Sequence, residues 1–281
     1  PCLTPIAGRP QGTCNTGTAA QRLPKLNQEN DAKIRVANEL AQHLDSDPFA
    51  ADYNRVGPTT NDTWGTMVRG EIALPWGMQL TSVAGYDGYD RLIDLDLDFS
   101  PETLFQIITD DQRWQAMQHF LREGQVVDTI PLRWEVGGWL LREHLDVTVI
   151  NDLGKQANFG AGRRDYTQDL WSTAGYASLS FDFWRDFTLD GGGRYNWEQK
   201  EMDFLLTNTA GTFPDDPNET WSQPTGTVRL TYRFREDTHV YWKYTRGWKP
   251  GSYNATSSPD TGVTVADPET IDAFETGVRG S

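Results

Sequence analysis

The segment from Trp221 to Asn254 constrains the fold more than any other, because its side chains alternate with a period of two over two long runs. The first run is apolar at every second position, and the residues between are polar; the apolar set is Gly226, Val228, Leu230, Tyr232 and Phe234. Three residues, Arg235 to Asp237, make a tight turn before the alternation resumes. Successive side chains of a strand point to opposite faces of a sheet. The segment is therefore predicted to form a long amphipathic β-hairpin.

The length of this hairpin leaves two folds open. Each run exceeds the roughly 5–6 residues typical of strands in globular proteins and reaches the roughly 9–11 residues that a tilted transmembrane strand requires. A soluble antiparallel sheet packs its apolar face inside the protein and leaves the other face in water. An outer-membrane β-barrel instead turns the apolar face to lipid and the polar face to the lumen. The hairpin alone does not decide between them.

Composition excludes some classes of protein and favours the second fold. The net charge of −15 over 281 residues argues against nucleic-acid binding, which needs a basic surface. Mean hydropathy is −0.61, and no run approaches the roughly 18 apolar residues of a membrane helix. Barrel strands interleave polar residues, so neither value excludes a barrel. Eleven tryptophans and an aromatic content of 12% suit the aromatic girdles of such barrels.

Residues 1–63 are expected to form an external loop region, because they contain no period-two run. One short helix is predicted there, from Asp31 to Leu44, where apolar residues recur at helical spacing. A soluble helical cap is the alternative. Cys2 and Cys14 are the only cysteines, and they are expected to form a disulfide in an oxidising compartment.

The connections between the predicted strands, which run from Trp64 to residue 281, alternate between short and long. Short turns are expected near 75–77, 124–131, 184–186 and 235–237, and long loops near 92–111, 146–168, 207–220 and 255–267. Residues 112–123 suit either a helix or a strand and are predicted to be a strand. If all the short turns lie at one end, the loops lie at the other, as in outer-membrane barrels with short periplasmic turns. A Greek-key sandwich has no reason to sort its connections in this way.

Metal and catalytic chemistry find little support in the sequence. Asp94, Asp96 and Asp98 alternate in a way that suggests calcium, but the glycine and the final glutamate of an EF-hand loop are missing, so a solvated acidic loop is expected. The four histidines are scattered, and no zinc-binding, phosphate-binding or serine-hydrolase motif is present. The sequence therefore predicts neither an enzyme nor a cofactor.

Three segments near the end of the chain resemble the TonB-dependent outer-membrane receptors. They are Tyr244–Asn254, Asp267–Thr270 and Phe274–Gly280, and the residues that match the family pattern are Gly247, Lys249, Gly251, Asn254, Pro268, Glu269, Glu275 and Gly277. Leu189–Tyr195 and Trp134–Leu140 resemble two further strands of the family. The resemblance covers about residues 64–281.

The resemblance implies an all-β fold, an antiparallel transmembrane β-barrel of about 22 strands with long external loops. Such receptors lie in the bacterial outer membrane and import ferric siderophores, or less often cobalamin or carbohydrate. A plug domain fills the lumen, and energy arrives through the TonB complex. About nine strands are expected in this chain, with no plug, no TonB box and no C-terminal strand that ends in an aromatic residue. It therefore resembles the middle portion of a receptor barrel.

The matched residues are expected to be mostly scaffold, with Gly247 and Gly251 permitting a close backbone approach or a bulge. By strand parity, Arg91, Lys200 and Lys249 are predicted to face the lumen near the external end, where they would attract an anionic ferric chelate. Solvated charges at the rim of a barrel are the alternative. Two other functions stay open, a passive porin or structural barrel and a soluble β-rich module that binds or hydrolyses carbohydrate. A plug and a TonB box would argue against the porin, and a requirement for detergent would argue against the soluble module.

Overall fold

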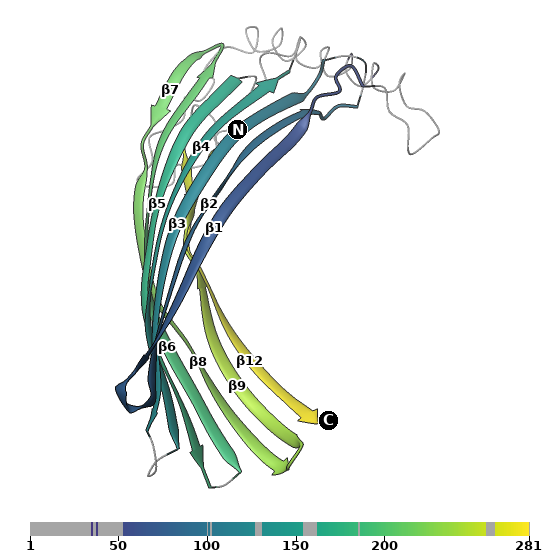
Figure 1. Ribbon diagram of the computed structural model, residues 1–281. Helices are drawn as coiled ribbons and strands as arrows, with labels where there is room; N and C mark the ends of the chain where they lie inside the picture. Colours follow the sequence, from purple (N-terminus) through teal and green to yellow (C-terminus); the bar gives the residue numbers. More distant parts are fainter. Residues whose placement is uncertain are drawn as a thin grey trace, which may run out of the picture.

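The computed structural model describes residues 35, 38, 53–99, 101, 103–126, 131–153, 162–184, 186–256 and 262–280. Nearly all of these residues lie in one antiparallel sheet, which is strongly twisted and curved (Figure 1). Its main path follows the order β1-β2-β3-β4-β5-β6-β8-β9-β12, with β7 paired to β6. Each main strand pairs with its neighbour in sequence, as in an up-and-down barrel wall. Among the described residues this path has the nine long strands that the sequence predicts.

The long strands are far longer than those of ordinary globular sheets. Their bounds are β1 (Thr59–Leu74), β2 (Met78–Asp96), β3 (Gln106–Val126), β4 (Leu132–Asp152), β5 (Gly162–Phe183), β6 (Phe187–Asn208), β8 (Asn218–Arg235), β9 (Thr238–Lys249) and β12 (Glu269–Gly280). Three short strands complete the fold, β7 (Gly211–Asp215), β10 (Ser252–Asn254) and β11 (Thr264–Ala266). A single turn of 3-10 helix, η1 (Pro75–Gly77), joins β1 to β2.

Cross-strand register confirms the two faces of the predicted hairpin. Leu230 on β8 pairs with Trp242 on β9 and with Leu189 on β6, so these three side chains share one face, here called the apolar face. The face that carries Arg229 and Thr231 is called the polar face. The apolar side chains are exposed: Leu189, Trp242 and Phe274 of β12 have 41%, 49% and 83% of their surface accessible. Among the described residues no second layer covers the apolar face.

Aromatic side chains form two belts on this sheet. The turn-side belt lies beside the short turns, and its rings contact one another in sequence: Phe181, Phe183, Trp184, Phe187, Tyr232 and Phe234. The distal belt lies further along the strands and consists of Trp64, Tyr86, Trp114 and Trp171. On β5 the belts are separated by about twelve residues, or roughly 40 Å along the strand. A tilt of roughly 45° reduces this to roughly 28 Å of height, close to the apolar band of a membrane barrel.

Beyond the distal belt the apolar side chains change face. Met202, Phe204 and Leu206 of β6 have only 4%, 5% and 3% of their surface exposed, and they lie on the polar face. Val147 and Leu170 are also buried on that face in the neighbouring strands. We call this part of the strands the distal half, and the part between the two belts the turn-side half. The only buried apolar residues of the described chain lie in the distal half.

The structure corrects the predicted loops: three are shorter than the sequence suggests, whereas the connection expected at 255–267 extends from 250 to 268. The expected loop 92–111 contains the end of β2 and the start of β3, and the expected loops 146–168 and 207–220 likewise contain strand residues. Strand β1 begins at Thr59 rather than Trp64, and residues 112–123 lie in β3 as predicted. The expected helix from 31 to 44 lies outside the described residues except for Arg35 and Asn38, which are helical. Cys2 and Cys14 lie outside them as well.

The acidic segment is not the solvated loop that the sequence predicts. Asp94 and Asp96 belong to β2 and are buried. Asp94 accepts hydrogen bonds from Arg55, at 2.9 Å from Nε and 2.6 Å from Nη2. Asp96 accepts bonds from the backbone of Asp98 and Phe99, each at 3.2 Å. These carboxylates stabilise the end of β2 through hydrogen bonds to the residues around it. The alternating sequence pattern does not indicate these partners.

Candidate functional site

A connection between β9 and β12 folds back over the polar face at the distal end. It comprises residues 250–256 and 262–268, and we call it the strap; its strands β10 and β11 pair with each other. The Tyr253 hydroxyl donates a hydrogen bond to the Lys200 carbonyl at 2.6 Å. The Val263 amide donates to Asp215 of β7 at 2.7 Å. The strap therefore passes over β8 and attaches to β6 and β7.

Two residues of the family pattern give the strap its local shape. A Cβ on Gly251 would lie 2.5 Å from the Trp221 ring, so only glycine lets the backbone pass over this indole. The Asn254 side chain accepts hydrogen bonds from the amide and the hydroxyl of Thr256, at 3.0 Å and 2.6 Å, which forms a local turn. A glycine and an asparagine at these positions start the return of the chain toward β6.

An apolar cluster holds the strap in place. The buried Met202, Phe204 and Leu206 contact partly buried residues of β5, β7 and the strap, namely Tyr166, Phe213, Tyr253, Ala255 and Val263. Burial raises the pKa of Tyr253 to about 12, so its hydroxyl remains protonated and can donate even in alkaline solution. The sequence carries a signal for this cluster, since the apolar residues of β6 move from odd to even positions between Trp197 and Met202.

Two of the three predicted ligand contacts are engaged by groups of the chain itself. Arg91 makes a two-pronged ion pair with the buried Asp111, its direct partner on β3, at 2.8 and 2.9 Å. The Lys200 ammonium donates to the Gly251 carbonyl at 2.9 Å and lies 3.1 Å from Glu198. Both cations lie on the polar face, as strand parity predicts, and both hold strands or the strap together.

Lys249 is in a different position. Its side chain is 70% exposed, and its nearest described carboxylate, Glu269 on β12, lies at 3.6 Å and is itself 75% exposed. A pair in this setting is weakly held, because water screens the attraction between exposed charges. The three predicted residues thus lie on one face but do not form a common cluster of free cations.

The other residues of the family pattern lie along β9 and β12. A Cβ on Gly247 would lie 2.9 Å from Ile271, and a Cβ on Gly277 would lie 2.7 Å from the Tyr241 ring. Glu275 accepts a short hydrogen bond from the Tyr241 hydroxyl, and Pro268 lies in the connection between β11 and β12. These glycines admit side chains of the neighbouring strand, which fits a scaffold role.

A cation-rich hollow that sequence reasoning missed lies on the polar face near the short turns. We call it the polar basin; its ionisable lining residues include Arg133, Asp190, Arg229, Arg233, His239, Lys243, Glu275 and Arg279. Two pairs neutralise part of this charge, Arg229 with Asp190 at 2.8 Å and Lys243 with Glu275 at 3.7 Å. The cations come from four strands, so no local sequence signal brings them together.

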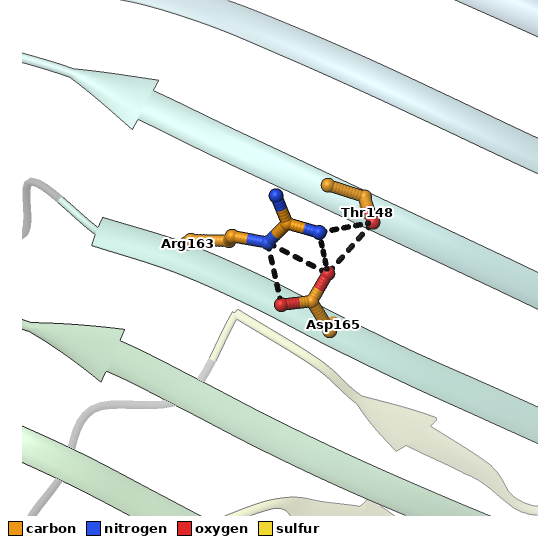
Figure 2. A network of polar contacts seen from close by, with 3 residues as sticks. All are labelled: Thr148, Arg163 and Asp165. Carbon is orange, nitrogen blue, oxygen red and sulfur yellow. Dashed lines mark hydrogen bonds and ion pairs between the residues drawn. The ribbon is translucent and has the colours of Figure 1, made fainter.

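The outer surface of the distal half has ion pairs of its own. Figure 2 shows Arg163 and Asp165 on β5 with Thr148 on β4. Asp165 accepts two bonds from the Nε of Arg163, at 2.9 and 2.6 Å, and one from the Thr148 hydroxyl at 2.7 Å. Beyond the distal belt, polar side chains such as Thr148 and Asp165 therefore occupy positions that continue the parity of the apolar face.

The described part of the chain contains no group of three or more histidine, cysteine or acidic side chains that could hold a metal ion. Its helical segments include none long and apolar enough to cross a membrane.

Similarity to solved structures supports the fold. The ferric yersiniabactin uptake receptor FyuA of Yersinia pestis matches with a TM-score of 0.62 and 17% identity, over 79% of this chain and 33% of that one. The siderophore receptor PiuA of Acinetobacter baumannii matches with a TM-score of 0.58 and 17% identity, over 78% of this chain and 37% of that one. The ferric-catecholate import receptor Fiu of Escherichia coli K12 matches with a TM-score of 0.57 and 14% identity, over 78% of this chain and 38% of that one. This chain thus spans about a third of the length of these structures.

Sequence comparison identifies the family. No curated protein sequence matches significantly. The family model described as "TonB dependent receptor-like, beta-barrel" matches residues 14–281, nearly the whole chain. This match agrees with the antiparallel order of the long strands and with the two faces of the sheet. The chain therefore belongs to the TonB-dependent receptor family, and the match covers the β-barrel of that family.

Proposed function

We propose that this chain forms the middle portion of the barrel wall of a bacterial outer-membrane receptor, which takes up a ferric siderophore or a similarly large nutrient by coupling to TonB. The observation that carries the proposal is the family match over residues 14–281. The solved structures of similar fold include receptors named for ferric yersiniabactin and ferric catecholates, which supports this class of cargo. The receptor is proposed to be a transporter and not an enzyme.

The exposed apolar face supports a membrane location. Between the two belts it presents Leu189, Val228 and Trp242, each more than 40% exposed, to whatever surrounds the sheet. Exposed apolar surface of this extent is costly in water. Lipid removes the cost, and the two belts then lie at the two membrane interfaces, where aromatic rings are favoured. The short turns would then be periplasmic and the strap external.

The polar face provides the inner wall in this proposal. The polar basin, with Arg233, His239 and Arg279 in its lining, would face the plug domain of the full-length receptor. At the external end Lys249 is the first candidate for contact with an anionic ferric chelate, because it is the most exposed of the three predicted cations. Arg91 and Lys200 would instead keep the rim rigid through Asp111 and Gly251.

The part of the predicted 1–63 region that precedes β1, residues 1–58, is proposed to form an external loop region. The disulfide between Cys2 and Cys14 remains a prediction. Labelling of thiols in the absence of reductant tests it, and two freely reactive cysteines would contradict it.

Uptake by the full-length protein tests the main proposal. Cells that depend on this receptor should accumulate iron-55 from a ferric siderophore, and either a protonophore or loss of TonB should abolish the uptake. The 281-residue chain alone, in liposomes, should give no coupled uptake. Permeation that is insensitive to both treatments would instead identify a passive porin. Lys249→Glu should weaken binding of an anionic chelate, whereas the same change at Lys243 in the polar basin serves as a control for charge.

A further inference from the structure

Arg142 lies on the apolar face at the level of the distal belt. Its guanidinium carbon lies 4.8 Å from the centre of the Trp171 ring and 5.7 Å from the centre of the Trp114 ring. Trp171 is its direct partner on β5, and Trp114 comes from β3 on the other side. A guanidinium held between two indoles is oriented by cation–π attraction without losing its hydrogen-bond donors.

The donors of Arg142 are not used within the described part of the chain. No hydrogen bond joins its guanidinium to a described residue, and its one ion pair there, with Asp169, is at the limit of 4.0 Å. Asp169 is more tightly held by His144, whose Nδ1 lies at 3.1 Å. The guanidinium of Arg142 is therefore half-exposed and oriented by the two indoles, and its N–H donors have only one weak partner among the described residues.

Arg163, on the same surface, provides a comparison, because its guanidinium is engaged by a carboxylate of the chain. It lies further out on β5, and its guanidinium is taken up by Asp165 (Figure 2). Arg142 has no such carboxylate, although acidic residues are plentiful in the distal half. The two arginines differ in their position along the strands. Arg142 lies at the boundary between the two halves: Leu140, two residues toward the turns, is 50% exposed on the apolar face, and Asp146, four residues in the other direction, lines a polar hollow of the distal half.

We infer that Arg142, clamped by Trp114 and Trp171, binds the phosphate of a membrane-lipid headgroup. The inference rests on the proposed membrane location, which puts the distal belt at the interface where headgroups lie and leaves Leu140 among acyl chains. Arginine presents parallel N–H donors that match two oxygens of one phosphate. The same anion chemistry occurs in free phosphate, but the apolar surface directly below the guanidinium selects an anion that carries acyl chains.

Binding of lipid A by the full-length receptor in detergent tests this site. Native mass spectrometry compares diphosphorylated lipid A with its dephosphorylated form, and inorganic phosphate is the competitor. The wild type should retain the diphosphorylated form preferentially. Arg142→Gln should weaken that binding about tenfold, as expected for loss of a charge-assisted bidentate contact. Arg142→Lys should restore part of it, and the control Arg163→Gln should bind like the wild type.

Several outcomes overturn the inference. Wild-type affinity in Arg142→Gln would do so, as would equal binding of the dephosphorylated lipid. Displacement by inorganic phosphate at concentrations comparable with the lipid would assign the site to a free anion. Heat-modifiable migration on gels verifies that each variant is folded, and Trp171→Leu, which keeps the charge but removes one indole, tests the clamp if Arg142→Gln does not fold. Uptake of the ferric chelate is measured separately, so a receptor that binds lipid A but imports nothing disproves only the proposed function.

Discussion

The turn-side half and the distal half of the same strands carry their apolar side chains on opposite faces. On β6, Leu189 and Tyr195 are exposed on the apolar face, whereas Met202, Phe204 and Leu206 are buried on the polar face. The backbone ladder runs unbroken through the change, with β6 paired to β5 from Phe187 to Asn208. The strand is the same, and only the surroundings of its two faces differ.

This difference shows that the alternation of apolar side chains depends on what covers each face of the sheet. The strand conformation alone does not determine which face is apolar. A side chain is apolar where it avoids water, whether against lipid on the outside or against protein on the inside. In the turn-side half nothing in the described chain covers the apolar face. In the distal half the strap covers the polar face, while the outer surface carries Asp165 and Thr148. The exchange of faces near the distal belt thus gives a second position for the proposed membrane boundary, beside that of the aromatic rings.

The largest expected effect is in the distal half, at the centre of the cluster under the strap. Phe204→Ala removes a side chain that is only 5% exposed, and a buried Phe→Ala change costs about 3–5 kcal/mol. The loss should appear as opening of the strap, because local units open before the sheet does. Amide hydrogen exchange in residues 250–256 should accelerate strongly. The neighbouring change Leu205→Ala, on the exposed face, should leave exchange nearly unchanged; equal acceleration by both would refute the assignment of faces.

The next effect is in the turn-side half. Leu230→Arg places a charge on the apolar face between the belts, where an arginine in lipid costs about 2–4 kcal/mol. Thr231→Arg puts the same charge on the polar face and should be tolerated much better. Folding into lipid vesicles across a urea titration measures both. The proposed barrel wall is wrong if the two variants unfold at the same denaturant concentration.

Stability alone does not tell lipid from a packed protein interior, so accessibility sharpens this prediction. Spin labels at 228, 230 and 232 should be quenched by oxygen dissolved in lipid. Labels at 227, 229 and 231 should be quenched by a water-soluble nickel chelate. Shielding of the first three from both quenchers would mean that protein, and not lipid, covers the apolar face.

These two halves also explain how much of the fold the sequence predicts. The hairpin around Leu230, the short turns and the nine long strands follow from period-two alternation, which is clear where one face meets a single apolar medium. The prediction of strand ends fails at β2 and β3, because the alternation changes phase after Leu92, where Asp94 and Asp96 take the positions that were apolar before, while the backbone pairing continues. The pairing of Arg91 with Asp111 depends on register across two strands, and so does the clamp around Arg142. No local pattern contains that register.

A smaller effect is expected at the hydrogen bond that ties the strap to β6. Tyr253→Phe leaves the Lys200 carbonyl without its 2.6 Å donor, and a bond of this kind contributes about 0.5–1.5 kcal/mol. The pKa of Tyr253 is raised to about 12, above the unfolded value of about 10. Attachment of the strap should therefore be complete below pH 10 and should weaken as the pH rises toward 12. Hydrogen exchange followed with pH should show this additional weakening in the wild type and not in Tyr253→Phe.

The smallest expected effect tests the comparison most directly, because it repeats the change of Leu230 in the other half. Leu205 has the parity of the apolar face but lies beyond the distal belt, where it is 38% exposed. Its direct partner across the strand is Asp165, so an arginine there would meet water and a carboxylate rather than acyl chains. Leu205→Arg should change the stability in vesicles by no more than about 0.5 kcal/mol, as is usual for surface substitutions. A penalty as large as that of Leu230→Arg would place this level inside the membrane, and the distal belt would then no longer mark the interface.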